Sequence, residues 1–142
     1  MTEFVSKSEK DTEYLAEKLA KKVKENDFIA FFGSMGMGKT TFTRYFAKAL
    51  GYNGDVSSPT FAIINEYNGG RLPIFHFDMY RIETFDDLYS TDFFAYCEKG
   101  GVVICEWSEI IENVLPEKFI KIDIEKGDGD FERVFRIEGI DL

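Results

Sequence analysis

The feature that most constrains this sequence is an eight-residue glycine-rich segment between an apolar run and a helix-like segment. Residues 33–40 read Gly-Ser-Met-Gly-Met-Gly-Lys-Thr, with Gly, Gly, Lys and Thr at the spacing of the phosphate-binding loop known as Walker A. The run before it, 28–32, is continuously apolar, which is typical of a strand buried on both faces. Residues 41–50 are typical of a helix, and Gly51 follows where helices commonly end. This order predicts a nucleotide-binding α/β fold.

Each defined position of the loop has a chemical reason. Gly33, Gly36 and Gly38 let backbone N–H groups approach phosphate oxygens with no Cβ in the way. The N-terminus of the following helix adds partial positive charge. Lys39, which we expect at an exposed helix start, supplies a full charge for the β- and γ-phosphates, and Thr40 offers a hydroxyl to Mg²⁺. A glycine turn that binds nothing is the alternative, and the flanking strand and helix disfavour it.

The other segments predict helices and hairpins around this unit. Apolar spacing and caps predict helices over 8–24, 84–98 and 109–115. Alternation and turn residues predict a hairpin of strands 62–67 and 72–78, a buried strand over 102–105, and a C-terminal hairpin with arms 120–124 and 131–137. We therefore predict a single domain over 1–142. Its fold is α/β and P-loop NTPase-like: a mixed sheet, parallel at its centre with antiparallel hairpins, flanked by helices.

Two acids end predicted buried strands, where nucleotide-hydrolysing enzymes of this kind place an acid near the metal. They are Asp78 and Glu106, and either one is a candidate to hold Mg²⁺ or to orient the attacking water. A solvated acid at a strand end is the alternative for each. His76 shares a strand face with Asp78 because side chains alternate, and we interpret it as a buried, hydrogen-bonded histidine. Trp107 is interpreted as a partly buried core aromatic that also reports on the site.

The second arm of the C-terminal hairpin carries an arginine on its apolar face. Alternation places Arg133 with Phe131, Phe135 and Ile137. An arginine among apolar side chains needs an anion or an acid as a partner. A nucleotide or carboxylate partner and a plain surface arginine therefore remain the two interpretations of Arg133.

Composition excludes several classes of protein. The formal net charge is −9, and direct nucleic-acid binding usually needs a basic face. The two cysteines, Cys97 and Cys105, form no CxxC pair, and His76 is the single histidine, so we expect reduced thiols and no zinc site. No apolar run approaches the roughly 20 residues of a membrane span, and the first residues lack a signal pattern. We therefore expect a cytoplasmic protein with no membrane contact.

Four separate segments together resemble one family. They are, in order, Gly36-Met37-Gly38-Lys39-Thr40-Thr41-Phe42-Thr43-Arg44, Ser58-Pro59-Thr60-Phe61, His76-Phe77-Asp78-Met79-Tyr80-Arg81 and Glu106-Trp107. Their order and spacing resemble the bacterial TsaE family, also called YjeE. The resemblance runs from about residue 6 to residue 137, and the combination is far more specific than the glycine loop alone.

The resemblance implies an ATPase of tRNA threonylcarbamoyladenosine synthesis. Such an ATPase uses ATP and Mg²⁺ and works with two larger partner proteins, which transfer a threonylcarbamoyl group to an adenosine beside the tRNA anticodon. The resemblance implies slow turnover alone and faster turnover with the partners. Because the chain is acidic, we expect it to reach tRNA through these partners and not by tight direct binding.

The resemblance also implies roles for particular residues. It implies that residues 36–41, which include Met37 and Thr41, bind the phosphates and that Lys39 is a catalytic residue. It also implies that Thr40 and Glu106 bind Mg²⁺. Asp78 is implied to serve in catalysis or to bind the water shell of the metal. Residues Ser58, Pro59, Thr60 and Phe61 form a switch-like loop near the γ-phosphate, and Thr12 lies near the nucleotide.

Two stretches depart from the family pattern. The loop reads Ser34-Met35-Gly36-Met37-Gly38, where the family usually has an acid followed by Leu-Gly-Ala-Gly. These changes fall at non-glycine positions, so phosphate binding is expected to persist. Between 87 and 95 the family pattern is weak, and Asp92 lies near an expected glycine.

Three other functions are weighed against this one. A small-molecule P-loop kinase usually has an arginine-bearing lid, and 82–101 contains no arginine. A GTPase is disfavoured because no Asn-Lys-x-Asp motif is present. A non-hydrolysing regulatory nucleotide-binding module remains possible, and it would bind nucleotide without turnover even with partners present.

Overall fold

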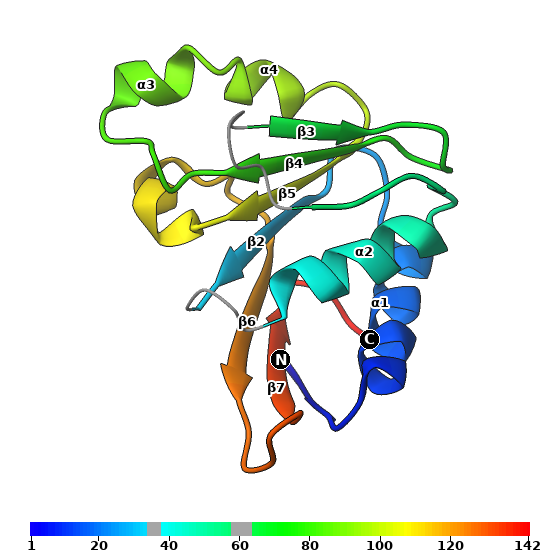
Figure 1. Ribbon diagram of the computed structural model, residues 1–142. Helices are drawn as coiled ribbons and strands as arrows, with labels where there is room; N and C mark the ends of the chain where they lie inside the picture. The colour runs from blue at the N-terminus through cyan, green and yellow to red at the C-terminus, as the bar shows by residue number, and fades with distance from the viewer. Residues whose placement is uncertain (34–37, 58–63) are drawn as a thin grey trace.

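A single mixed sheet organises the chain in a computed structural model that describes residues 1–33, 38–57 and 64–142 (Figure 1). In these residues the sheet has seven strands in the order β1-β7-β6-β2-β5-β4-β3. Their bounds are β1 (Thr2–Ser6), β2 (Phe28–Phe32), β3 (Ile64–Tyr67), β4 (Ile74–Asp78), β5 (Val102–Glu106), β6 (Ile120–Lys126) and β7 (Arg133–Glu138). The helices are α1 (Glu9–Lys22), α2 (Lys39–Ala49), α3 (Phe85–Tyr89), α4 (Phe93–Tyr96) and the 3-10 helix η1 (Ser108–Val114).

The pairing confirms the predicted mixed α/β fold. The central strands β4, β5, β2 and β6 run parallel, whereas β3–β4, β6–β7 and β1–β7 are antiparallel. Both predicted hairpins are therefore present. In the β4–β5 register Asp78 lies opposite Glu106, so the two predicted acids end adjacent parallel strands.

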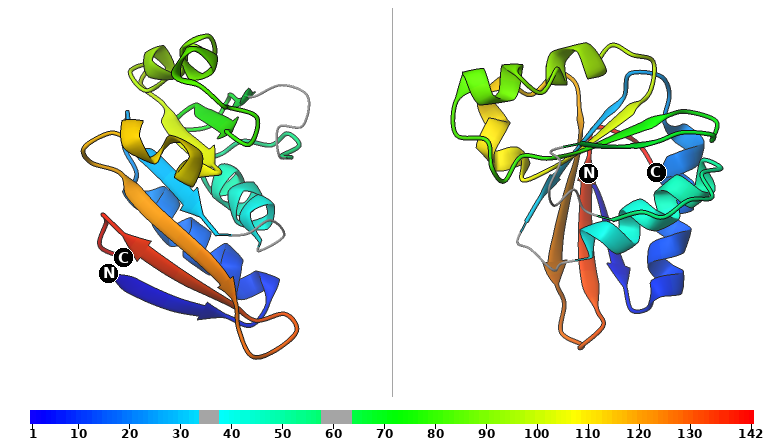
Figure 2. Two further views of the ribbon diagram at one scale, coloured as in Figure 1. Left: turned by 90° about the vertical axis from the view of Figure 1, so that its left-hand side faces the viewer. Right: turned by 45° about the horizontal axis from the view of Figure 1, so that its top comes forward.

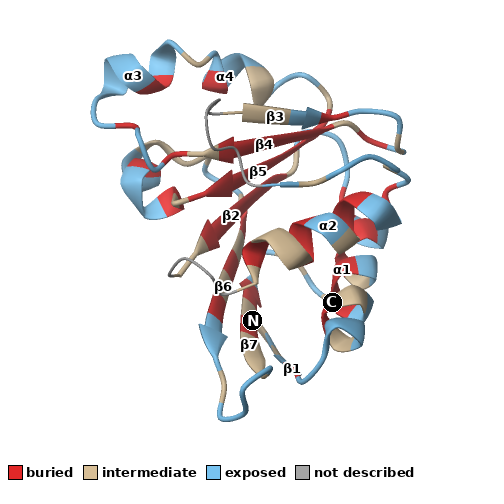
Figure 3. Cartoon of the chain, in the orientation of Figure 1, coloured by how far each residue is buried: buried red, intermediate tan, exposed pale blue. Residues whose placement is uncertain are grey.

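Helices cover both faces of the sheet (Figure 2). On one face α1 and α2 pack over a core that includes Phe31, Phe42 and Phe46. On the other face α3, α4 and η1 cover a second core around Phe77 and Phe93. Figure 3 shows the middle of the sheet as its most buried part. Two-sided burial explains the continuous apolar sequence of β2 and β5.

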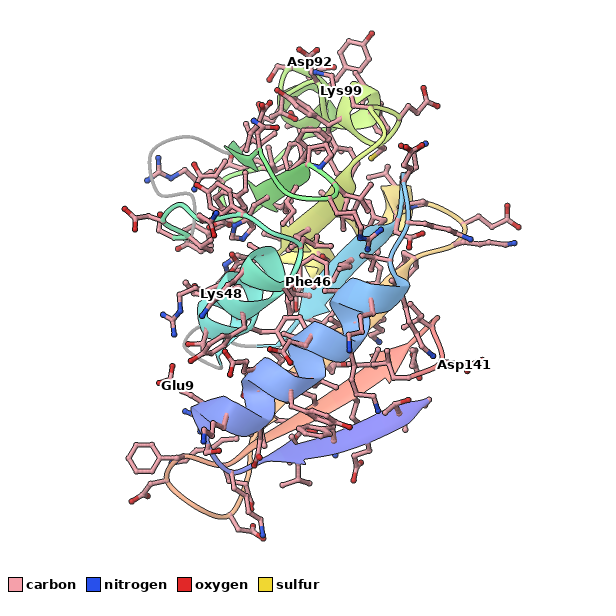
Figure 4. The ribbon with its side chains drawn as sticks, turned by 90° about the vertical axis from the view of Figure 1, so that its right-hand side faces the viewer. Glu9, Phe46, Lys48, Asp92, Lys99 and Asp141 are labelled. Atoms are coloured by element: carbon pink, nitrogen blue, oxygen red, sulfur yellow. The ribbon has the colours of Figure 1, made fainter. Side chains whose placement is uncertain are left out.

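Helices α1 and α2 begin close to where the sequence predicts. The Ser8 side chain caps α1 and accepts a hydrogen bond from the Asp11 amide at 3.3 Å. Helix α2 begins directly after the glycine loop, at Lys39. Figure 4 shows Phe46 on the inner side of α2 and Lys48 on its outer side. The buried side chains of α2 fix this helix on the sheet, and with it the end of the glycine loop.

The structure differs from the sequence prediction in three elements. Strand β1 was not predicted, and it pairs with β7 near the other end of the chain. The helix predicted over 84–98 is two short helices, because Asp92 adopts a left-handed conformation with φ of 62° and breaks the run. The helix predicted over 109–115 is the 3-10 helix η1, with a kink at Ile111.

The cysteines match their prediction as free thiols in or near the core. Cys105 is buried and Cys97 is half-buried. Burial raises the pKa of the Cys97 thiol to about 11 and that of Cys105 to about 12, so both stay protonated near neutral pH. Within the residues that the structure describes, no helix has the length and apolar content needed to cross a membrane.

Candidate nucleotide-binding site

The glycine loop joins the end of β2 to the start of α2, and two of its glycines are required by geometry. Gly33 has φ of 110°, and a Cβ there would lie 2.8 Å from the Ile124 carbonyl oxygen. Gly38 has φ of 94° and is the N-cap of α2, with no side chain to occupy the helix end. The amides that open α2 are therefore oriented as in an anion-binding helix N-terminus. The predicted phosphate contacts Gly36 and Met37 lie outside the described residues.

Lys39 is buried, which corrects the prediction of an exposed helix start. Only 5% of Lys39 is exposed, because its side chain folds back and its Nζ donates to the Gly33 carbonyl oxygen at 2.9 Å. Nζ also lies 5.3 Å from the centre of the Trp107 ring, within cation–π range. These two contacts hold the ammonium at the loop.

A cavity of about 560 Å³ opens beside the start of α2. Its volume falls in the range of small-molecule sites. It is lined by Lys7, Ser8, Glu9, Thr12, Gly38, Thr41, Phe131, Arg133 and Phe135. Three predicted nucleotide contacts, Thr12, Thr41 and Arg133, therefore share one cavity wall with Gly38. The Thr12 hydroxyl is already paired with the Ser6 hydroxyl at 2.7 Å.

The surroundings of Arg133 differ in part from the prediction. Phe131 is 81% exposed and precedes β7, so it adds little to the buried face of Phe135 and Ile137, although it lines the same cavity as Arg133 and Phe135. The reason is that the turn extends to Glu132 and the strand alternation begins only at Arg133. The Arg133 guanidinium donates to the Glu132 carbonyl oxygen at 2.9 Å and borders the cavity. A role in nucleotide binding stays a prediction.

The two acids lie side by side at the carboxyl ends of β4 and β5. Asp78 is half-buried and accepts a hydrogen bond from the Tyr80 amide at 2.9 Å. Burial, and to a lesser degree the nearby Glu106, raises the pKa of Asp78, while the Tyr80 amide and Lys39 act in the opposite direction. Glu106 is buried, and one carboxylate oxygen lies 2.5 Å from His76 Nε2.

His76 is a buried, hydrogen-bonded histidine, as the sequence predicted. Its Nδ1 lies 2.9 Å from the Tyr67 hydroxyl, and its ring is fully buried. Sequence reasoning missed Tyr67, although the hairpin register contains the signal. Tyr67 pairs with Ile74, two residues before His76, which places it on the same sheet face.

Trp107 and Tyr80 connect the loop to the strand ends. Trp107 is half-buried, in agreement with its interpretation, and its ring lies 5.2 Å from that of Tyr80. Sequence reasoning did not single out Tyr80. The predicted switch-like residues, Ser58 to Phe61, lie outside the described residues. Among the described side chains no three His, Cys, Asp or Glu gather as a complete metal site.

Comparison with known proteins identifies one family. The family model described as "Threonylcarbamoyl adenosine biosynthesis protein TsaE" matches residues 6–135. The chain belongs to the TsaE family. A Bacillus subtilis TsaE is 42% identical over 123 residues, covering 87% of this chain and 76% of that protein. An Aquifex aeolicus TsaE is 39% identical over 111 residues, covering 77% and 78% of the two chains.

A solved structure shares the fold. The crystal structure of Bacillus subtilis YdiB superposes with a TM-score of 0.77 at 35% identity. The match covers 94% of this chain and 82% of YdiB. The sequence comparisons show the family, and the structural match shows the fold.

Proposed function

We propose that this chain binds and hydrolyses ATP as a component of tRNA threonylcarbamoyladenosine synthesis, acting with the two larger threonylcarbamoyl-transfer proteins. Membership of the TsaE family supports the pathway. One structural observation carries the ATPase role: Trp107, next in sequence to Glu106, lies 5.3 Å from Lys39 Nζ. This contact joins the phosphate loop to the strand end that carries the acid.

The nucleotide fits across two parts of the site. The triphosphate belongs at the α2 N-terminus, where the helix dipole, the amides that open α2 and the Lys39 ammonium all favour negative charge. When the Lys39 ammonium moves from the Gly33 carbonyl oxygen to a phosphate oxygen, it exchanges a neutral acceptor for a charged one. The base and ribose belong in the adjoining cavity, where Phe131 offers a ring and Thr12 and Arg133 offer polar groups.

Mg²⁺ is the metal that the side chains fit. Mg²⁺ commonly takes one or two carboxylates together with phosphate oxygens and water, and a buried carboxylate and a hydroxyl beside the loop are ligands of this kind. Glu106 and Thr40 are the residues proposed to hold it. When bound, the metal would neutralise charge on the phosphates.

Asp78 is the proposed residue for hydrolysis. Its raised pKa makes its carboxylate more basic than an exposed aspartate, which favours orienting a water or accepting its proton. Its backbone partner, the Tyr80 amide, fixes the orientation of one oxygen. Partner proteins that complete the geometry around Asp78 would explain slow turnover in the isolated chain. The switch-like segment Ser58 to Phe61 is proposed to respond to the γ-phosphate.

An exposed aromatic cluster supports a protein partner. Phe85, Tyr89 and Phe94 are exposed, and the Phe85 ring centre lies 6.3 Å from that of Tyr89 and 5.9 Å from that of Phe94. Residues 83–98 contain five acids and no lysine or arginine. Exposed apolar clusters mark interaction sites, and the acidic surroundings disfavour direct contact with tRNA. A partner surface with an apolar centre and basic edges fits this cluster.

Product analysis separates this proposal from its alternatives. The chain is incubated with ATP or GTP and Mg²⁺, alone and with the two transfer proteins and tRNA, and the products are resolved by phosphorus NMR. The proposal predicts inorganic phosphate from ATP. Phosphoryl transfer to a small molecule supports a kinase, and binding without turnover in every mixture supports a regulatory module.

A further inference from the structure

Three side chains from adjacent strands form a buried chain of hydrogen bonds that ends on Glu106. The Tyr67 hydroxyl of β3 lies 2.9 Å from His76 Nδ1 of β4, and His76 Nε2 lies 2.5 Å from a Glu106 carboxylate oxygen of β5. All three residues are buried. Its members lie next to buried apolar side chains of the same sheet face, among them Ile74 and Ile104.

From this geometry we infer that His76 and Tyr67 are positioning residues that fix the Glu106 carboxylate for Mg²⁺. The inference rests on the proposed function, because it concerns the same metal. It assigns a role to a histidine that sequence reasoning treated as structural, and to a tyrosine that it did not single out. Neither residue contacts substrate in this role, since both act through Glu106.

The carboxylate at the end of these hydrogen bonds fixes which nitrogen of His76 donates to it. A carboxylate accepts, so His76 Nε2–H donates to Glu106. Burial raises the pKa of Tyr67, so its hydroxyl keeps its proton, and it lies 2.9 Å from His76 Nδ1. The Tyr67 hydroxyl donates to the Ser57 carbonyl oxygen at 3.0 Å, and the same oxygen also accepts from Asn65 Nδ2 at 3.0 Å.

This arrangement removes the freedom that a lone glutamate at a strand end would have. A glutamate side chain has three rotatable bonds and loses conformational entropy when it is fixed on a metal. The buried His76 ring already holds one carboxylate oxygen, and Tyr67 holds the ring. Outer partners of this kind typically change metal affinity by roughly 10–100-fold when they are mutated.

The test is Mg²⁺ dependence of nucleotide binding, read from the fluorescence of the single tryptophan, Trp107. ADP is titrated in EDTA and at stepped Mg²⁺ concentrations. Tyr67→Phe removes one hydroxyl and is expected to raise the Mg²⁺ concentration for half-maximal effect severalfold. His76→Ala is expected to raise it about tenfold or more. His76→Gln keeps an N–H donor and is expected to recover part of the loss. ADP affinity in EDTA is expected to stay unchanged in all three.

Tyr52→Phe is the matched control. Its ring packs on Tyr67 at 5.0 Å, but its hydroxyl bonds to the Asp55 carbonyl oxygen and not to His76. It is expected to leave the Mg²⁺ dependence unchanged. If His76→Ala does not fold, Tyr67→Phe and His76→Gln carry the test.

A second readout needs neither nucleotide nor metal. Because His76 is the single histidine, nitrogen-15 NMR reports its tautomer without assignment ambiguity. The inference predicts a proton on Nε2 in the wild-type chain. A proton on Nδ1 alone would overturn it. So would wild-type Mg²⁺ dependence in both Tyr67→Phe and His76→Gln, which leaves the proposed function intact. A wild-type chain whose ADP binding ignores Mg²⁺ would overturn the inference and the metal role together.

Discussion

The Lys39 ammonium lies 5.3 Å from the centre of the Trp107 ring and 2.9 Å from the Gly33 carbonyl oxygen. The lysine therefore bridges the loop that follows β2 and the end of β5. Both contacts involve groups that are weaker partners for a cation than a phosphate oxygen is. Lys39 is thus held in a position from which a bound triphosphate can draw it.

Replacing Lys39 should remove productive ATP use. In Lys39→Met the charge is lost while much of the buried stem is kept, so turnover should fall about a hundredfold or more while circular dichroism remains that of the wild type. Melting should shift downward because the bond to Gly33 is lost. Lys48→Met is the control, since Lys48 is exposed on the same helix. Wild-type turnover in folded Lys39→Met would contradict the site.

Trp107 emission should report nucleotide binding. ATP draws the ammonium from the ring, which changes the environment of the single tryptophan. Lys39→Met should show altered emission without nucleotide and little further change when ATP is added. Calorimetry supplies an independent binding curve. Saturating ATP that leaves wild-type emission unchanged would refute the Lys39–Trp107 link.

Asp78→Asn should raise stability at neutral pH while lowering turnover. Burial raises the pKa of Asp78 above its ordinary value of 3.8, so ionisation favours the unfolded state. The contribution of the protonated Asp78 carboxyl to the free energy of unfolding is fully present below pH 3.8. It is lost as the pH rises through the pKa of Asp78 in the folded state. Asparagine avoids this loss and keeps an oxygen for the Tyr80 amide.

The measurement is a series of melting temperatures between pH 3 and pH 8, a range around the ordinary carboxyl pKa of about 4. The advantage of Asp78→Asn over the wild type should be largest at the high end and should vanish near the low end. Asp55→Asn, at an exposed position, is the control. An advantage that is independent of pH would show that ionisation of Asp78 is not its cause.

The aromatic cluster should contribute to partner binding. Phe85→Ser and Tyr89→Ser should each weaken affinity for the two transfer proteins by roughly tenfold, which is a typical effect of a central interface aromatic. Nucleotide binding alone should be unaffected. Tyr14→Ser alters an exposed aromatic on α1 and is the control. Unchanged partner affinity in both cluster variants would place the interface elsewhere.

The isolated chain should not bind tRNA appreciably. At a net charge of −9, long-range electrostatics oppose approach to a polyanion, and no counterion release by a basic face offsets this. A gel-shift assay at about 0.15 M salt, the physiological value, should show free tRNA. A shift at low micromolar protein would contradict the division of labour between this chain and its partners.

The sequence predicts the parts of the fold that local patterns determine. The loop 33–40 requires a strand before it and a helix after it, and both are present as β2 and α2. Turn residues and alternation likewise located both hairpins. Strand β1 escaped prediction because its five residues are stabilised by pairing with β7, which is distant in sequence.

The site is predictable only where chemistry follows from a motif. Asp78 and Glu106 were located because they end predicted strands, and their adjacency follows from the β4–β5 register. The burial of Lys39 depends on a contact with Gly33 that spacing does not encode. The role of Tyr67 depends on the pairing of β3 with β4, which is a property of the folded sheet.

The central claim is that this chain hydrolyses ATP and that its partners accelerate the reaction. The most direct measurement is steady-state phosphate release from Mg²⁺–ATP by the chain alone, by the two transfer proteins without it, and by the three together. The account predicts slow release by the chain alone, marked acceleration in the full mixture, and loss of that acceleration with Lys39→Met. Phosphate release in the full mixture that equals the sum of the separate components, or that is unchanged by Lys39→Met, would contradict it.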